Sequence, residues 1–204
     1  MNPDLIVYGN PTQEHLAYLN YEGLFDDLFS EVVKYKFPKN SSEATKQELN
    51  NIVDNLGIIQ NQKHFVNRYK AYDKSLRRSI YEFILKGTEY AEDAMEMVEN
   101  VIEDTNSLLL KLKYHHQRPR PYQLAKFYKL KLFPYESHSS QSPSFPSGHA
   151  FQIRLLTEVI GNNFPEVYGM MQKMMMDVCY SRIYLGLHYE SDVDVGLFVA
   201  DKVL

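Results

Sequence analysis

The chain has 204 residues, of which 44% are hydrophobic and 24% are charged, a composition typical of one globular domain with a sizeable core. Its net charge of -4 argues against nucleic acid or an anionic membrane as a partner. Because Cys179 is the single cysteine, an internal disulfide and a cysteine-based zinc site are excluded. The sequence does not open like a signal peptide, and no apolar run approaches the ~18 residues of a membrane span. We therefore expect a cytoplasmic protein, or a periplasmic one if a signal was removed.

The spacing of hydrophobic residues predicts helices and no persistent strand, which indicates one all-α, bundle-like domain over residues 1–204. Gly57 and Gly87 are the expected stops of two helices, and Pro119 and Pro121 follow the long central one. In chain order the sequence predicts an irregular arm over 1–22, helices over 24–33, 42–56, 60–86 and 89–114, one or two helical turns over 122–129, a loop over 130–146, and helices over 147–164, 165–185 and 191–204.

Near the end of the chain, an arginine, a histidine and an aspartate follow one another at spacings of six and four residues. These are Arg182, His188 and Asp192. Asp192 can accept the Nδ1 proton of His188 and leave Nε2 bare, which suits a base, a metal ligand or a nucleophile. A guanidinium group nearby suits phosphate or carboxylate. Taken alone, a histidine with an acid four residues away is more often structural.

A second stretch, Ser144–His149, contains a Ser-Gly pair, Ser147 and Gly148, at the predicted start of a helix. The first N–H groups of a helix have no partner within it, and together with the positive helix end they bind anions. Gly148 allows a close approach because it has no Cβ. The competing interpretation is an ordinary helix start capped by Ser147, with His149 on the surface.

A third stretch, residues 111–122, gathers four cations and two histidines at the end of the long central helix. Cations are favourable at a helix C-terminus, so a solvated basic end is the plain interpretation. However, Arg118 and Arg120 alternate with Pro119 and Pro121, and proline restricts the backbone. The two guanidinium groups are therefore expected to be held in place.

Together, these stretches resemble the motifs of one superfamily, which includes lipid phosphatases (phosphatidic acid phosphatase type 2), class A bacterial acid phosphatases and vanadium haloperoxidases. Its motifs are Lys-x6-Arg-Pro, Pro-Ser-Gly-His and Ser-Arg-x5-His-x3-Asp, and all three occur here in order, with unbroken spacing, between residues 111 and 192. The tail Ser191-Asp192-Val193-Asp194 looks most like the soluble class A acid phosphatases. The first 90 residues carry no such motif.

The first motif fits in two registers, Lys111 with Arg118 or Lys113 with Arg120. Residues two apart on a helix face different ways, so only one lysine should reach the phosphate. We favour Lys113 and Arg120, because Tyr122 follows the second Arg-Pro pair and an aromatic residue follows it in class A relatives.

The resemblance implies a role for each residue that matches a motif. His188 attacks phosphorus and becomes a phosphohistidine, and Asp192 orients it. His149 protonates the leaving alkoxide and then activates water. The phosphate-binding residues are Lys113, Arg120, Ser147, Gly148 and Arg182. Neither a metal nor another cofactor is implied. The chemistry is coherent in itself, since phosphoryl transfer needs mostly positioning and stabilisation of negative charge.

The favoured function is a soluble phosphomonoesterase acting on small organic phosphates, with nucleotides among the candidates. A lipid phosphate phosphatase is the first alternative, although relatives of that kind usually span membranes. A vanadium-dependent haloperoxidase and a non-enzymatic phosphate-binding protein are further alternatives. Relatives often form dimers or larger assemblies, so a homo-oligomer is compatible with the resemblance, but no interface is legible in the sequence.

Overall fold

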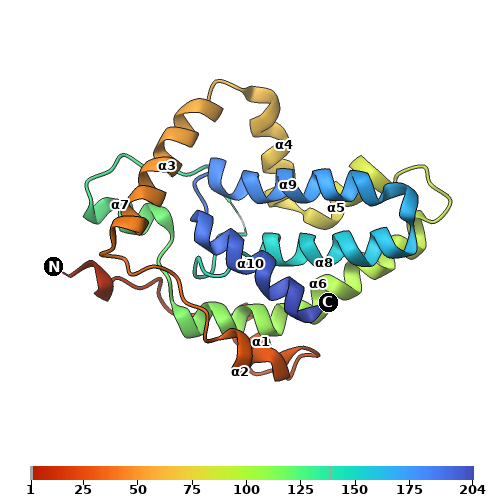
Figure 1. The fold of residues 1–204 in the computed structure, drawn as a ribbon, viewed down its shortest axis with the longest axis horizontal. Coiled ribbons are helices and arrows are strands. Elements are labelled where there is room, and N and C mark those ends of the chain that lie inside the picture. Colours follow the sequence, from red (N-terminus) through yellow and green to blue (C-terminus); the bar gives the residue numbers. More distant parts are fainter. Residues whose placement is uncertain (1, 138) are drawn as a thin grey trace.

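The computed structural model describes residues 2–137 and 139–204, and within them it is all-helical and contains no strand (Figure 1). The predicted fold class is thereby confirmed. The α-helices are α1 (Gln13–Leu19), α2 (Phe29–Val32), α3 (Glu43–Ile59), α4 (Lys63–Lys74), α5 (Leu76–Ile80), α6 (Ala91–His116), α7 (Pro121–Phe127), α8 (Gly148–Asn163), α9 (Tyr168–Tyr184) and α10 (Glu190–Val203).

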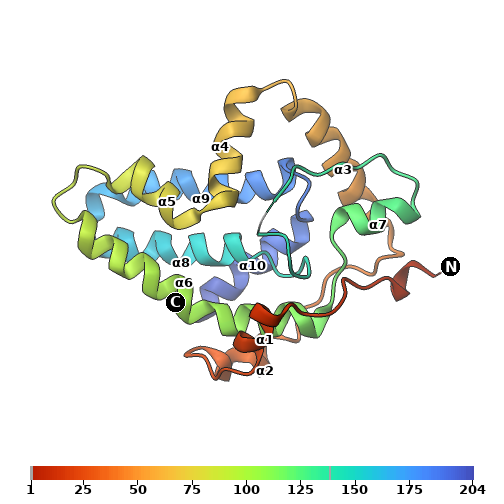
Figure 2. The ribbon, with the colours of Figure 1, turned by 180° about the vertical axis from the view of Figure 1, so that it is seen from behind.

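Helix α8 lies at the centre of the fold and packs against α9, α10 and α6 (Figures 1 and 2). Ten of its sixteen residues are buried, including Phe151, Ile153 and Leu156, because apolar side chains occur on nearly every side of the helix. Gly196 lets α10 cross α8 closely, since a Cβ there would lie 2.6 Å from the carbonyl oxygen of Ser147. The start of α8 is therefore enclosed by its neighbours.

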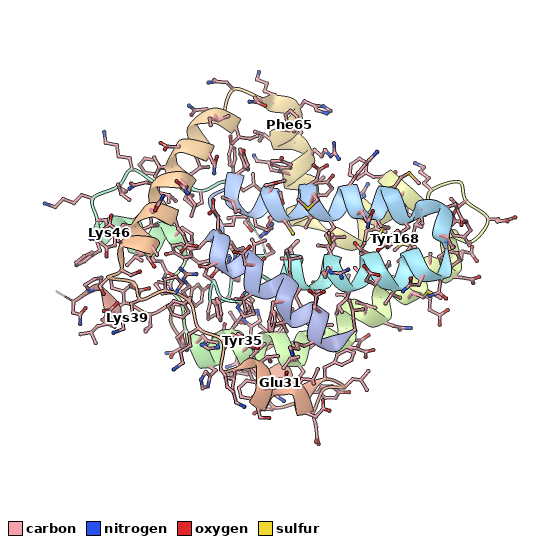
Figure 3. The ribbon with its side chains drawn as sticks, viewed as in Figure 1. Glu31, Tyr35, Lys39, Lys46, Phe65 and Tyr168 are labelled. Atoms are coloured by element: carbon pink, nitrogen blue, oxygen red, sulfur yellow. The ribbon has the colours of Figure 1, made fainter. Side chains whose placement is uncertain are left out.

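The N-terminal half wraps around this centre. Helices α3 and α4 diverge from their connecting turn like the arms of a V, and both pack against α9 (Figures 1 and 2). The segment of α1 and α2 lies along the opposite side, against α6. Glu31 and Tyr35, labelled in Figure 3, attach this segment to α10. The Glu31 carboxylate lies 3.0 Å from Lys202 Nζ, and the Tyr35 ring lies 4.4 Å from the Phe198 ring.

The predicted helix over 60–86 is wrong in one respect, because it breaks at Ser75. That residue is extended, with φ -165° and ψ 107°, and its hydroxyl accepts a hydrogen bond from the Arg78 N–H at 3.1 Å. Helix α5 follows, and a single π-helical turn over Tyr81–Leu85 completes the segment. Serine competes well for helix caps, which explains the break. Conversely, α3 runs through Gly57, the predicted stop, to Ile59.

The arm over 1–22 is also not wholly irregular, since it contains α1. The hydroxyl of Thr12 caps this helix by accepting from the His15 N–H at 3.2 Å, and α1 packs against α6. The predicted helix over 24–33 is shorter than expected and reduces to a 3₁₀ turn and α2. Among the described residues, no helix combines the length and hydrophobicity needed to cross a bilayer.

Candidate active site

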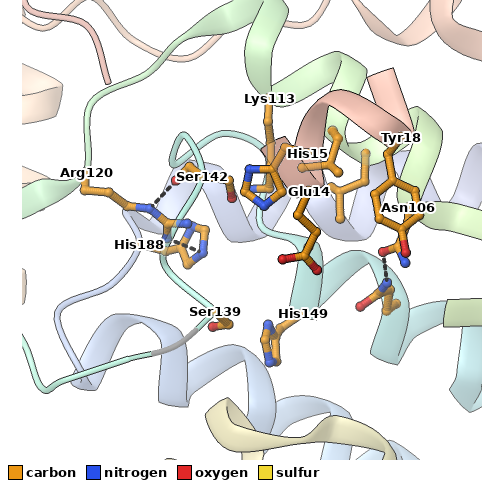
Figure 4. A pocket seen from close by; sticks show the side chains of 14 residues that line it. Glu14, His15, Tyr18, Asn106, Lys113, Arg120, Ser139, Ser142, His149 and His188 are labelled. Atoms are coloured by element: carbon orange, nitrogen blue, oxygen red, sulfur yellow. Dashed lines mark hydrogen bonds between the residues drawn. The ribbon is translucent and has the colours of Figure 1, made fainter. Parts of the chain in front are cut away.

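The three motif stretches meet around a cavity of about 230 Å³, which we call the catalytic cavity (Figure 4). It lies where six segments come together: α1, the second half of α6, the connection between α6 and α7, the loop before α8, the start of α8, and the turn between α9 and α10. The lining residues come from all of these segments: Glu14, His15, Tyr18, Asn106, Leu109, Leu110, Lys113, Arg120, Ser139, Ser142, Gly148, His149, Gln152 and His188.

His188 and Asp192 form the pair expected from their spacing. The Nδ1 of His188 lies 3.1 Å from Asp192 Oδ2, and both side chains are buried. Arg120 Nη1 lies 2.9 Å from His188 Nε2. Because a guanidinium group can only donate, Nε2 accepts and the ring proton sits on Nδ1, which donates to Asp192. Burial, and then Arg120, hold the pKa of His188 well below its usual value, so the ring is neutral.

Asp192 is held by four donors. Its Oδ1 accepts from Arg118 Nη1 at 2.6 Å. Its Oδ2 accepts from the Ser144 hydroxyl, from His188 Nδ1 and from the backbone N–H of Tyr189 at 3.0 Å. Burial alone would raise the pKa of this carboxyl, but Arg118 and the other donors outweigh burial, so that the pKa lies well below its usual value. Asp192 is therefore an ionised acceptor.

Lys113 and Arg120 both face the catalytic cavity, and their hydrogen bonds to the protein go to backbone carbonyls and to His188. Lys113 Nζ donates to the Pro143 oxygen at 2.8 Å. Arg120 Nε donates to the Ser142 oxygen at 2.8 Å, and its Nη1 to the Leu187 oxygen at 2.9 Å. Burial lowers the pKa of Arg120 to about 10 and that of Lys113 well below its usual value.

The other register, Lys111 with Arg118, points elsewhere. Lys111 Nζ lies on the outside of α6, 2.5 Å from an Asp26 oxygen and 2.7 Å from the Tyr21 carbonyl. Arg118 is fully buried behind the pair of His188 and Asp192. Neither side chain lines the catalytic cavity.

His149 also points into the catalytic cavity (Figure 4). Its Nε2 donates to the carbonyl of Tyr72 at 3.3 Å, which leaves Nδ1 without a proton in the neutral ring. Burial, and then the charge of Arg182, lower the pKa of His149 to about 3. This side chain is therefore a neutral imidazole at neutral pH.

Ser147 and Gly148 begin α8 at the cavity. The Ser147 hydroxyl caps the helix by accepting from the Ala150 N–H at 3.4 Å, and it is buried rather than exposed to the cavity. Gly148 does line the cavity, and a Cβ there would lie 2.7 Å from a methyl carbon of Leu109. Only glycine at position 148 lets Leu109 of α6 pack this closely against the start of α8.

Arg182, the third predicted phosphate-binding cation, is fully buried and does not line the cavity. Its Nη1 donates to Asp73 Oδ1 at 2.9 Å, and its Nη2 donates to the Ser139 hydroxyl at 3.0 Å. Ser139 belongs to the cavity lining, so its side chain lies between Arg182 and the catalytic cavity. Burial alone would raise the pKa of Asp73, but Arg182 and two serine hydroxyls outweigh it and keep that pKa low.

The sequence analysis did not predict the carboxylates that pair with Arg118 and Arg182, nor the residues of α1 that line the entrance of the catalytic cavity. Glu48 on α3 accepts from Arg118 Nη2 at 3.0 Å, and Asp73 on α4 pairs with Arg182. Helix α1 adds Glu14, His15 and Tyr18 to the cavity wall. A buried acid within an apolar helical stripe is the only local signal for Glu48, and its arginine partner lies 70 residues away.

Comparison with known proteins identifies the fold. No family model matches the chain, and no curated protein matches it. Among solved structures, the fold is similar to the crystal structure of a transmembrane PAP2 type phosphatidylglycerolphosphate phosphatase from Bacillus subtilis, with a TM-score of 0.51 and 17% sequence identity. The match covers 93% of this chain and 91% of that chain. The resemblance seen in the motifs thus extends to the whole structure: the chain has the fold of the PAP2-type phosphatases.

Proposed function

We propose that the protein is a phosphomonoesterase that hydrolyses small, water-soluble organic phosphates through a phosphohistidine on His188. One observation carries this proposal. Asp192 fixes the His188 ring with its lone pair on Nε2, which lies 2.9 Å from Arg120 Nη1, and Lys113 lines the same cavity. Within the described residues, neither Lys113 nor Arg120 forms an ion pair with a carboxylate. A nucleophile beside unneutralised positive charge is the arrangement that phosphoryl transfer requires.

The reaction follows from these positions. A phosphate dianion entering the cavity takes over hydrogen bonds from Lys113 and Arg120, and this frees Nε2 to attack phosphorus. The bond from phosphorus to the ester oxygen breaks as the bond to Nε2 forms. His149 supplies a proton to the departing oxygen, and in the second step it takes one from the attacking water. Asp192 stabilises the positive charge on the phosphorylated ring.

The low pKa values of Lys113 and His149 are consistent with this cycle. Burial disfavours the charged forms of Lys113 and His149, whereas a bound dianion favours them. Substrate binding is therefore expected to bring a proton to His149, which converts it into the general acid. The acid is made only when there is a leaving group to protonate.

The lining beyond the phosphate site favours a small polar alcohol. Glu14, His15, Tyr18 and Asn106 surround the space on the side of α1 and α6 (Figure 4), and Gln152 lines it from α8. These side chains offer hydrogen bonds rather than an apolar channel, and about 230 Å³ suits a compact leaving group. The carboxylate of Glu14 would repel a second phosphate near the ester.

A lipid phosphate is the second candidate substrate, because the similar structure from Bacillus subtilis is described as a phosphatidylglycerolphosphate phosphatase. A substrate panel separates the two candidates. We expect glycerol phosphate and short alkyl phosphates to be hydrolysed faster than phosphatidylglycerolphosphate presented in detergent micelles. The opposite order would assign the lipid substrate.

Rapid-quench kinetics with two variants test the mechanism. His149→Ala should still be phosphorylated by p-nitrophenyl phosphate, whose leaving group needs little protonation, but its phosphohistidine should break down slowly for lack of a base. Acid-labile phosphate should then accumulate on His188, with a burst of about one equivalent of p-nitrophenolate. An alkyl phosphate should give no burst. Phosphate trapped on Ser147, or trapped by the His188→Ala variant, would refute the assignment of the nucleophile.

A further inference from the structure

The first arginine of the Arg-Pro repeat, Arg118, does not line the catalytic cavity, yet it binds the carboxylate of Asp192, which orients the nucleophile His188. Its Nη1 lies 2.6 Å from Asp192 Oδ1, on the oxygen opposite to the one that faces His188. Arg118 is fully buried, and the distance is that of a charge-assisted hydrogen bond. Asp192 is therefore shared between a permanent cation and the imidazole ring.

The surroundings fix Arg118 in this position. Its guanidinium carbon lies 3.8 Å from the centre of the Tyr189 ring and 4.7 Å from that of Phe37, so that aromatic rings contact it closely. Its Nη2 donates to Glu48 Oε2 at 3.0 Å, and its Nη1 also donates to the Ser191 hydroxyl at 2.8 Å. A residue so held cannot swing into the cavity to contact phosphate.

The consequence concerns the second half of the proposed reaction. After transfer, Nε2 of His188 carries the phosphoryl group, and the ring still carries its proton on Nδ1, next to Asp192. When water attacks phosphorus, the P–N bond breaks and its electron pair returns to Nε2. If Nδ1 has kept the proton, the group that leaves is neutral imidazole. If Asp192 has taken the proton, the leaving group is an imidazolate anion, which is far poorer.

Since this step belongs to the function proposed above, the inference rests on it. We propose that Arg118 is a positioning residue which keeps the Nδ1 proton on phosphorylated His188, so that the phosphohistidine can be hydrolysed. Arg118 does this by holding negative charge on Asp192: a carboxylate bonded to a buried guanidinium has little affinity for another proton. Glu48 orients the guanidinium from the other side, and it also accepts from the Ser191 N–H at 2.7 Å.

The double variant Arg118→Met/Glu48→Gln tests the proposal. Removing both charges avoids leaving the Glu48 carboxylate buried without its cation. We expect Asp192 to take the Nδ1 proton in this variant, so that phosphohistidine forms with p-nitrophenyl phosphate but breaks down roughly tenfold or more slowly, since one close opposite charge shifts a carboxyl pKa by one to three units. Rapid quench into alkali should recover the phosphate on His188, and p-nitrophenolate should show a burst that the wild type lacks.

Two controls separate this role from general damage. Lys111→Met removes a cation from the same stretch but outside the cavity, and Glu48→Gln leaves Arg118 on Asp192, so neither should accumulate phosphohistidine. A double variant that is slow without a burst would mean that Arg118 only aligns His188, and the proposal would fall. The proposed function itself would fail differently, with no phosphate trapped on His188 even in His149→Ala.

Discussion

The buried cations of the site fall into two groups that differ in their partners. Arg118 and Arg182 each pair with a carboxylate from the N-terminal helices, Glu48 on α3 and Asp73 on α4. Lys113 and Arg120 line the cavity and bind backbone carbonyls, with His188 as a further neighbour of Arg120. The positive charges of Arg118 and Arg182 are therefore neutralised by protein carboxylates, whereas those of Lys113 and Arg120 can be neutralised by a bound anion.

The difference shows what each half of the chain contributes: the C-terminal half carries the buried cations, and the N-terminal half supplies carboxylates for two of them. Burying a cation without a counter-charge is costly, so each unneutralised group destabilises the empty protein and favours anion binding. Glu48 and Asp73, from the N-terminal half, offset that cost for Arg118 and Arg182, whose other hydrogen bonds go to protein side chains. Among the four buried cations of the site, the two without a carboxylate partner in the described part of the chain, Lys113 and Arg120, are the two that line the cavity.

The strongest way to break this arrangement is to remove the group that the cations face. His188→Ala should lower kcat by on the order of 10⁴-fold or more, because no other nucleophile replaces it. Inorganic phosphate should still raise the thermal midpoint of the variant, since Lys113 and Arg120 remain. Turnover within tenfold of the wild type, measured with p-nitrophenyl phosphate, would exclude His188 as nucleophile.

Breaking a neutralised pair should cost stability first. Asp73→Asn leaves Arg182 buried without its counter-charge, and we expect the free energy of unfolding to fall by about 3 kcal/mol or more. Urea denaturation measures this loss. The double variant Asp73→Asn/Arg182→Met should recover part of the stability, because it no longer buries a cation without its counter-charge. A single variant as stable as the wild type would show that Arg182 needs no counter-charge.

Removing an unneutralised cation should do the reverse. Lys113→Met should lower kcat/KM by about 10²- to 10³-fold, the cost of losing one donor to the transition state, without lowering the stability of the phosphate-free protein. Lys111→Met is the matched control on the same helix, and its effect on kcat/KM should stay under about twofold, because Lys111 does not line the catalytic cavity and binds Asp26 instead. If Lys111→Met is the more damaging change, the other register is correct.

Acid should destabilise the protein through two partly buried histidines, His149 and His116. Burial lowers the pKa of His149 to about 3 and that of His116 to about 4, below the ~6.5 of an unfolded histidine. Between these values the unfolded state binds more protons, so stability falls as the pH drops from 7 toward 4. We expect a loss of about 1 kcal/mol per histidine between pH 7 and 5.5. His149→Gln should flatten the thermal midpoint against pH, and an unchanged slope would contradict the shift.

The smallest effect concerns the mouth of the cavity. Glu14 is an exposed carboxylate that faces incoming phosphate, so Glu14→Gln should raise kcat/KM for p-nitrophenyl phosphate by about two- to threefold at low salt, a gain that salt should screen. Glu22→Gln, which lies outside the lining, is the control. Equal effects of the two variants would place Glu14 outside the path of the substrate.

Local patterns were enough to predict the all-helical class and most helix positions, since the predicted 147–164 helix corresponds to Gly148–Asn163. The three motifs also predicted a cluster of His188, Asp192, His149 and Lys113. In the structure His188, His149 and Lys113 line the catalytic cavity, and Asp192 contacts His188. The pairing of Glu48 and Asp73 with arginines could not be predicted, because it depends on contacts between helices far apart in the sequence. The break at Ser75 escaped prediction because neither glycine nor proline marks it.

The attachment of α1 has a kinetic consequence. None of its residues is buried, and it is tied to α6 by a few bonds, such as His15 to Tyr114 at 2.8 Å and the Ser107 hydroxyl to the Tyr18 carbonyl at 3.3 Å. Segments of this kind detach at a small fraction of the free energy of global unfolding. Detachment would widen the entrance while His188 and Asp192 stay in register. Bulky phosphate esters would then be hydrolysed at the frequency with which α1 opens, and small ones at the speed of the chemistry.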